Sequence, residues 1–411
     1  MGAFDVRLHP AVSLFAASLI AFVPFEAAAQ DVASPSVSVR ERPRPEYDPQ
    51  GLRFGGFDLN ANVDVGVAST DNLFAAESNE QSDLIYTVSP EARLTSHWSR
   101  NALTLAAGLT HTGHRDFDSE DSTTGFVSGQ GRLDVGGNTQ ISGGARYARE
   151  VESRTDVDSL TTGEPVKYDV TQASVSAAHT FNYIQVSATA ARTELNYHNT
   201  PTSFQDFRDS TENAGTLRAE YELSPRIGLV GQMTLDRRKY DNDPGLSSNG
   251  RTYLVGLAIN FTDLMKGQIA VGEFNRDYDF GDHVSGTAVD ANLEWYITQL
   301  TTLSFTADRS GQDQGATTAD PYIESSFGAH VDHELLRNVI LSAGIVKGKR
   351  DYEVIDRNDD YTSGQISAEY ILNRRVALSA KYQHDSVDSS GANRYRNFDV
   401  NTFSLGLSLR L

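Results

Sequence analysis

Charged side chains that alternate with apolar ones are the main candidates for chemistry in this 411-residue sequence. They recur at every second position of long apolar–polar segments, so they would share one face of a β-strand. The charged and amide members of these rows are Glu91, Arg93, Arg146, Arg218, Glu220, Glu222, Asp290, Asn292, Glu294, Glu369 and Lys381. Around a water-filled lumen, such groups would select solutes by charge. The alternative is a solvated wall of paired charges, or a wall that holds an internal plug.

Two pairs of histidines are the candidates for a catalytic site. His111 and His114 lie near one predicted strand end. His330 and His333 flank Asp332. A Ser–His–Asp hydrolase would need such groups at one height of the fold, and Ser and Asp are common enough in the loops to become neighbours by coincidence. We therefore predict no catalytic residues, no metal ligands and no cofactor, and the sequence has no dinucleotide fingerprint or P-loop.

The composition excludes several classes of protein. The formal charge is −20, whereas a nucleic-acid-binding protein usually presents a basic face, so nucleic-acid binding is not expected. The chain has no cysteine, which excludes a disulfide scaffold, a Cys-ligated zinc site and a Cys nucleophile. With 39% hydrophobic residues and a mean hydropathy of −0.40, the chain is too polar for a helical membrane protein.

The N-terminal part of the chain predicts two segments ahead of the main domain. Residues 1–29 have the pattern of a secretory signal peptide, in which Ala11–Phe25 is apolar and small residues predict cleavage before Gln30. Residues 30–51 contain four prolines and predict an extended periplasmic segment. The main domain then spans residues 52–411.

The main domain has a period of two. Apolar residues alternate from Phe57 to Val67, and the last such row runs from Phe403 to the final residue, Leu411. A bilayer-spanning β-strand needs about 9–11 residues with one apolar face, and these segments have that length. Only Pro90 falls inside a predicted strand, where its missing N–H predicts a bulge.

The connections between these rows alternate between short and long. Eight short ones lie near residues 98–101, 136–139, 181–183, 223–226, 262–267, 298–301, 335–338 and 373–375. One strand on each side of every connection predicts about 18 strands, with 16 as the alternative, and places both ends of the domain on the side of the short turns. A sheet inside lipid has to close. We therefore predict an all-β fold, a transmembrane up-and-down antiparallel β-barrel, rather than a β-propeller or a soluble β protein.

Two motifs carry a resemblance to a known family. The Pro-rich segment Arg40–Gly51 precedes the first strand, and Thr70-Asp71-Asn72-Leu73-Phe74 ends it. Together they resemble the β-barrel porin type 2 family of proteobacterial outer membranes, in which a Tyr-Asp-Asp-Asn-Val/Ile-Phe motif follows the first strand. Asp71, Asn72 and Phe74 match this motif, whereas its first two residues are replaced. The resemblance implies an outer-membrane barrel of a Gram-negative bacterium, and many members accompany systems that export exopolysaccharide or capsule.

The predicted function is a porin-like conduit for the export of a surface polysaccharide. The alternatives are a general or solute-specific diffusion porin and, less favoured, an outer-membrane enzyme or adhesin. The expected partners are outer-membrane lipid and lipopolysaccharide, the barrel assembly machinery through the C-terminal strand, and a polysaccharide export lipoprotein, with no nucleic acid. Because carboxylates outnumber basic groups in the inner rows, an open lumen should prefer cations.

Overall fold

The computed structural model describes residues 37–157, 159–160, 163–242, 244–261, 264–279, 283–313 and 320–411. The predicted signal peptide lies outside these residues. The described part of the chain contains 19 β-strands and three single-turn 3-10 helices. No helix within it is long and apolar enough to cross a membrane.

The strands are 13 to 16 residues long, apart from the first, which has three. Their bounds are β1 Leu52–Phe54, β2 Phe57–Thr70, β3 Asp83–Ser96, β4 Ala102–His114, β5 Ser122–Val135, β6 Thr139–Val151, β7 Lys167–Phe181, β8 Ile184–Tyr197, β9 Ser210–Ser224, β10 Ile227–Tyr240, β11 Ser248–Phe261, β12 Met265–Tyr278, β13 His283–Thr298, β14 Thr301–Asp313, β15 Pro321–Leu336, β16 Val339–Tyr352, β17 Asn358–Asn373, β18 Val376–Ser390 and β19 Phe398–Arg410. The 3-10 helices are η1 Asp118–Glu120, η2 Asp206–Arg208 and η3 Pro244–Leu246.

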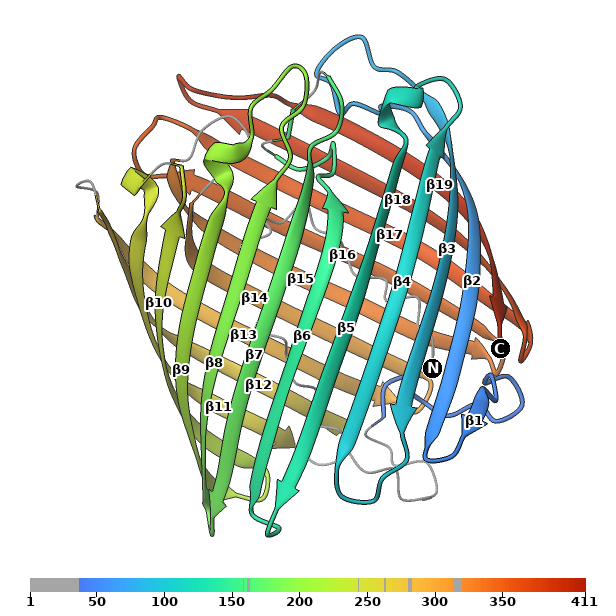
Figure 1. Cartoon of the computed structure of the whole chain (residues 1–411), viewed down its shortest axis with the longest axis vertical. Coiled ribbons are helices and arrows are strands. Elements are labelled where there is room, and N and C mark those ends of the chain that lie inside the picture. Colours follow the sequence, from blue (N-terminus) through green and yellow to red (C-terminus); the bar gives the residue numbers. More distant parts are fainter. Residues whose placement is uncertain are drawn as a thin grey trace.

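Strands β2 to β19 form a closed barrel (Figure 1). Each pairs antiparallel with the next along the chain, and β19 pairs with β2 from Arg410↔Asn62 to Thr402↔Thr70. The short strand β1 pairs with the start of β2. The structure therefore confirms the predicted all-β class and the predicted 18 strands of the barrel.

The two ends of the barrel differ. The eight predicted short turns lie together at one end, called the turn end below, and the longer connections lie at the other, called the loop end. In the turn between β5 and β6, Gly136 and Gly137 have φ of 66° and 88°. A turn with two positive φ values matches the right-handed twist of the strands that it joins. Both β2 and β19 have their free ends at the turn end, where the backbone N–H of Leu411 donates to the carbonyl of Ala61.

The outer surface of the barrel is apolar. Leu229 and Leu257, which face each other across β10 and β11, are 44% and 42% exposed. Trp98, Phe181 and Tyr183 are exposed at the turn end, as in the aromatic girdle that marks a membrane interface. An apolar outer face with such a girdle is suited to a bilayer.

Two local expectations from the prolines are wrong. Pairing of β3 with β4 skips Ser89 and Pro90 but resumes in the same register, so the missing N–H of Pro90 interrupts the ladder without a bulge. In the Pro-rich segment, the N–H of Arg42 donates to the carbonyl of Ser38, and the N–H of Asp48 to that of Arg44. These residues form two turns, because a chain docked against a wall can satisfy its backbone groups locally.

Candidate functional site

The barrel lumen is the candidate site, and all eleven predicted lumen residues lie on inner-facing rows. Directly opposed residues of neighbouring antiparallel strands share a face of the sheet. Glu294 opposes Lys266, Asp290 opposes Asp308, and Lys381 opposes Ser404. The predicted residues are spread over β3, β6, β9, β13, β17 and β18, so they surround the lumen and do not cluster at one point.

Many of these side chains are paired with one another or with neighbours. Glu91 contacts Arg93 at 3.3 Å, and Glu220 contacts Arg218 at 2.9 Å. Glu294 pairs with Lys266 at 3.3 Å. Paired carboxylates attract a passing cation less than free ones do, so the excess of inner acids does not by itself set the ion preference.

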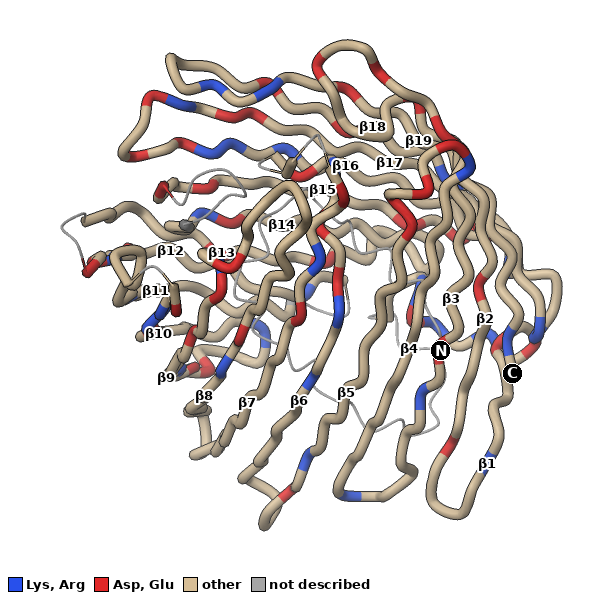
Figure 2. Tube along the Cα trace, turned by 45° about the horizontal axis from the view of Figure 1, so that its top comes forward, with Lys and Arg blue, Asp and Glu red and all other residues tan. Residues whose placement is uncertain are grey.

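Charged residues are spread unevenly over the barrel (Figure 2). In the figure, the middles of β5 and β7 carry almost no charged residue, whereas charges gather toward the loop end. The inner row of β7 includes Gln172, Ser174 and Ser176, whose partners across the ladder on β8 include Thr193 and Thr189. This side of the lumen therefore offers hydroxyl and amide groups in place of charges.

At the turn end, a chain segment lies inside the barrel against the inner wall. This turn-end segment, residues 38–48, belongs to the Pro-rich region. The backbone N–H of Val39 donates to Thr302 Oγ1 at 3.0 Å. Arg40 donates to Asp332 Oδ1 at 2.8 Å and to Ser342 Oγ at 2.6 Å. Since these partners lie on the inner rows of β14, β15 and β16, the segment occupies the lumen.

The other two arginines of the segment converge on one carboxylate. Arg44 pairs with Glu334 at 3.2 Å, and the two side chains are 2% and 3% exposed. Arg42 lies 3.8 Å from the same carboxylate. Burial lowers the pKa of the Arg42 guanidinium, and Glu334 opposes that shift. From the adjacent turn, Arg337 donates to the carbonyl of Pro43. The alternating arginines were visible in the sequence, but their acidic partners lie about 290 residues away.

At the loop end, the connection between β6 and β7 enters the barrel. This lumen loop spans residues 152–166, of which 152–157, 159–160 and 163–166 are described. Val157 is 1% exposed and belongs to an apolar cluster with Val346, Tyr361 and Val387 of β16, β17 and β18. Those strands lie across the barrel from β6 and β7 (Figure 1), so the loop spans the lumen.

Buried arginines hold the lumen loop in place. Arg396, from the loop between β18 and β19, donates to the carbonyl of Arg154 at 2.7 Å, to that of Asp156 at 2.9 Å and to Ser159 Oγ at 3.1 Å. Arg154 itself pairs with Glu120 at 2.7 Å. Neither Arg396 nor Val157 was among the residues predicted from the sequence. The signal available was an apolar side chain, Val157, in a mostly polar loop.

The family motif closes the barrel at the loop end. Asn72 is fully buried and donates from Nδ2 to the carbonyls of Ala76 and Asp399. Asp71 accepts from the backbone and side chain of Asn401 on β19. The ring of Phe74 packs edge-on against Phe117 at 5.1 Å. The motif thus connects the end of β2 to β19, the strands that close the barrel, and its role is structural.

The predicted histidine pairs are split between the two faces of the wall. His330 contacts Asp332 at 3.1 Å on the inner face. His333 opposes Thr301 in the next row, on the outer face. His111 and His114 are also three residues apart, so they point to opposite faces. Among the described residues, no group of three or more His, Asp or Glu side chains could hold a metal ion.

A closed barrel with polar inner rows is the architecture of a pore, and comparison with known proteins agrees. The model of the family described as "Putative beta-barrel porin 2" matches residues 44–411. The chain belongs to this porin family. Together with the closed barrel, membership makes it an outer-membrane β-barrel protein, and confirms the family that the two motifs suggested.

Solved structures of outer-membrane proteins are similar in fold. OpdK of Pseudomonas aeruginosa is 12% identical in sequence, and the match has a TM-score of 0.46. It covers 86% of the chain described here and 99% of OpdK. OccK2 (OpdF) of the same organism is 14% identical, with coverage of 88% and 100% and a TM-score of 0.47. The ferric enterobactin receptor PfeA, also from P. aeruginosa, is 8% identical, with coverage of 85% and 80% and a TM-score of 0.44. No curated protein matches the chain.

Proposed function

We propose that the protein is a passive, selective conduit for small hydrophilic solutes across the outer membrane. The observation that carries this proposal is the pair of chain segments inside the lumen, one at each end of an 18-stranded barrel. A barrel of this size encloses an aqueous channel unless chain segments fill it. The turn-end segment and the lumen loop restrict the path, and the inner rows supply the polar contacts for a solute in transit.

Conductance of the purified protein in planar bilayers tests this function. We expect stepwise ion currents, and entry of small sugars into proteoliposomes at a rate that falls with sugar size. The matched variant lacks residues 38–48 and should conduct more. An absence of current and of sugar entry from both proteins would contradict the conduit.

Export of a surface polysaccharide is a second candidate. The family resemblance implies it, and the uncharged hydroxyl and amide rows of β7 and β8 favour it, because sugar hydroxyls bind to such groups without a charge requirement. Deletion of the gene followed by staining for surface polysaccharide distinguishes the two candidates. Loss of the polymer would favour export, and an unchanged polymer with lower uptake of solutes would favour diffusion.

We propose that the turn end faces the periplasm and the loop end the cell surface, where outer-membrane lipid and lipopolysaccharide surround the barrel. An epitope inserted near Asn242, in the loop between β10 and β11, should be accessible on intact cells. One inserted near Asn338, in the turn between β15 and β16, should not be. We further propose that the barrel assembly machinery recognises β19, since Phe403, Leu405 and Leu409 form an alternating apolar row on its outer face. If the protein exports a polysaccharide, its expected partner is an export lipoprotein.

A further inference from the structure

The barrel wall has an incomplete ladder between β13 and β14. Their pairing runs from Thr298↔Thr301 only as far as Val289↔Arg309. Residues 283–288 of β13 pair with β12 alone, and residues 310–313 of β14 pair with β15 alone. The two strands therefore separate toward the loop end.

The ring of Phe274, on the inner row of β12, fills part of this separation and is 4% exposed. A Cβ built on Gly286 of β13 would lie 3.0 Å from the ring, and one built on Gly311 of β14 would overlap with it. The two glycines thus make room for the ring between the strands. Leu254, Val284 and other apolar residues complete the cluster around it.

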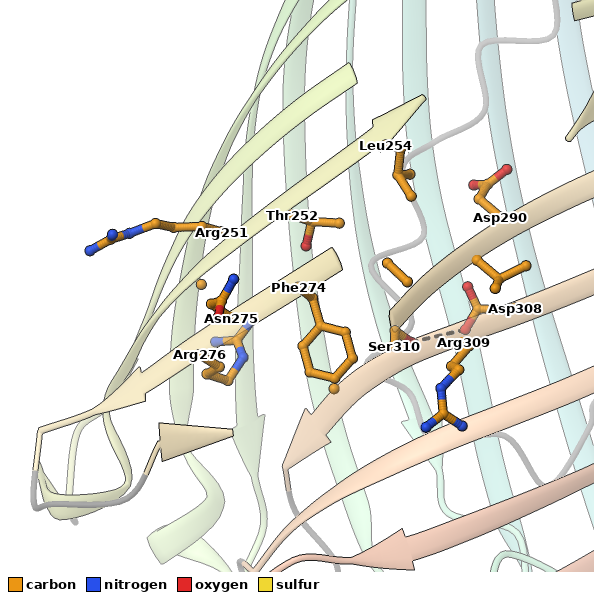
Figure 3. A pocket seen from close by; sticks show the side chains of 14 residues that line it. Arg251, Thr252, Leu254, Phe274, Asn275, Arg276, Asp290, Asp308, Arg309 and Ser310 are labelled. Atoms are coloured by element: carbon orange, nitrogen blue, oxygen red, sulfur yellow. Dashed lines mark hydrogen bonds between the residues drawn. The ribbon is translucent and has the colours of Figure 1, made fainter. Parts of the chain in front are cut away.

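A pocket with a volume of about 110 Å³ opens beside Phe274 (Figure 3). Its lining includes Leu254, Asp290, Asp308 and Ser310 from the inner rows of β11, β13 and β14. In the figure, the two carboxylates lie on the same side of the pocket, and the Arg251 side chain points away from it. The pocket therefore combines an apolar wall with two acidic groups.

The two carboxylates oppose each other directly across the ladder. Like charges in opposed positions destabilise a sheet. Asp290 accepts a hydrogen bond from Gln268 Nε2 at 2.9 Å, and Asp308 accepts one from Ser310 Oγ at 2.9 Å. These donors are neutral, so they hold the carboxylates in position without cancelling their charge.

Most other acids of the inner wall have a cationic partner. Those in ion pairs include Glu91, Glu150, Glu212, Glu220, Asp236, Glu294, Glu324, Asp332, Glu334, Asp359 and Glu369. Among the described residues, neither Asp290 nor Asp308 forms an ion pair. Arg276 and Arg309 also line the pocket. The guanidinium of Arg276 is already bound to Asp236 at 2.7 Å and to Ser248 at 2.8 Å, and Arg309, on the outer row of β14, donates to Ser325 of β15. The pocket thus holds two carboxyl groups that have no ion-pair partner among the described residues.

We propose that this pocket binds the cationic end of a small organic solute, a primary alkylammonium group, as a step on its path through the lumen. The ammonium lies between Asp290 and Asp308 and donates to both in charge-assisted hydrogen bonds. The first carbons of the chain pack on Phe274 and Leu254, and the ring face adds a cation–π attraction. A cavity needs about 10–15 Å³ of such space to hold one water molecule, so a pocket of about 110 Å³ admits a head group with two or three carbons.

Titration calorimetry with n-propylammonium chloride on the detergent-solubilised full chain tests the site. We expect saturable binding by the wild type and none of the neutral analogue n-propanol. Asp290→Asn and Asp308→Asn keep the shape of the side chains and should each weaken binding at least tenfold. Asp64→Asn removes an inner-row carboxylate of β2 that lies outside the pocket and also accepts from a neutral donor, Asn62, and it should leave the affinity unchanged. Binding that is absent in the wild type, or weakened as much by Asp64→Asn, would overturn the proposal.

Gly311→Ala tests the pocket without a change in charge. Its new Cβ would meet the ring of Phe274, so the ring has to move and the pocket changes shape. We expect affinity for propylammonium to fall at least fivefold while the barrel stays folded, as judged by its heat-dependent mobility in gels. Unchanged affinity in this variant would show that the carboxylates act from the open wall, which contradicts a pocket.

The inference names a solute class for the conduit, so it rests on the proposed function. Separate measurements nevertheless test the pocket and the conduit. Calorimetric binding without any bilayer conductance would leave the pocket standing and remove the conduit. Conductance that propylammonium does not block, combined with no calorimetric binding, would remove the pocket and leave the conduit.

Discussion

The two segments inside the barrel are held in different ways. The turn-end segment docks through charges: Arg40 and Arg44 reach Asp332 and Glu334, and the backbone of the segment forms its own turns. The lumen loop docks through an apolar contact, with Val157 inside the cluster on the opposite wall, and buried Arg396 binds its carbonyls.

The difference predicts different dynamics. The contacts of Arg40, which is partly exposed, weaken in salt and can be replaced by water or by a passing ion, whereas the buried pair of Arg44 with Glu334 is screened much less. An apolar side chain that leaves its cluster loses the free energy of burial, about 1.5–3 kcal/mol for a residue of this kind. We therefore expect the lumen loop to be a permanent part of the folded barrel, and the turn-end segment to be the part that moves.

Arg396→Ala should release the lumen loop. The guanidinium donates to carbonyls of two separate segments, those of Phe74 and Ala75 and those of Arg154 and Asp156. Hydrogen bonds to a charged group contribute about 1.5–3 kcal/mol each without adding fully. We expect the free energy of unfolding to fall by about 3 kcal/mol and trypsin to cleave the Arg154–Thr155 bond faster. Denaturant unfolding and limited proteolysis measure both effects.

Arg394→Ala is the matched control, since Arg394 lies two residues away, is exposed and contacts Glu77 in a single ion pair. An exposed pair contributes at most about 1 kcal/mol. Equal effects of the two substitutions would show that Arg396 does not hold the loop.

Val157→Ala should loosen the loop without removing any polar contact. The change takes two methyl groups out of an apolar cluster, which costs about 2 kcal/mol when the lost burial and the remaining cavity are combined. Ser153→Ala changes an exposed position of the same loop and should cost almost nothing. If Val157→Ala left both stability and single-channel conductance at the wild-type values, the apolar anchor would have no role.

Arg40→Gln should change selectivity more than stability. Its side chain neutralises Asp332 and lies 3.7 Å from Glu369. Water at the turn end can solvate both carboxylates once the arginine is gone, so we expect a stability loss of about 1 kcal/mol or less. The reversal potential in a salt gradient should move toward cation preference, because two carboxylates lose a partner. Arg53→Gln, at an exposed ion pair on β1, should leave the reversal potential unchanged.

The local features of this fold could be predicted from the sequence. The period of two placed Leu229 outside and Glu220 inside, because successive side chains of a strand alternate between the two faces whatever the neighbours are. The alternation of short turns and long loops predicted the number of strands. Both the strand faces and the turns depend on residues that are close together in the chain.

The long-range features could not be predicted. That Asp290 opposes Asp308 depends on the register of β13 against β14, and that Val157 meets Val346 depends on how a loop crosses the barrel. Both associations join residues brought together only when the sheet has closed. The contact of Asn72 with Asp399 could not be predicted either. The motif of Asn72 was recognised in the sequence, but this contact forms only where β19 pairs with β2.

The smallest expected effect separates the two segments by salt alone. Trypsin can cleave one peptide bond in each segment. In the turn-end segment this is Arg40–Glu41, because a proline follows both Arg42 and Arg44. In the lumen loop it is Arg154–Thr155. Between 0.1 M and 1 M KCl the Debye length falls from about 10 Å to about 3 Å. The partly exposed contacts of Arg40 with Asp332 and Glu369 therefore weaken, while the burial of Val157 does not. We expect cleavage at Arg40–Glu41 to become about two- to threefold faster relative to a free peptide substrate, and cleavage at Arg154–Thr155 to stay constant. Salt that accelerated both cleavages equally would mean that charge holds the two segments alike.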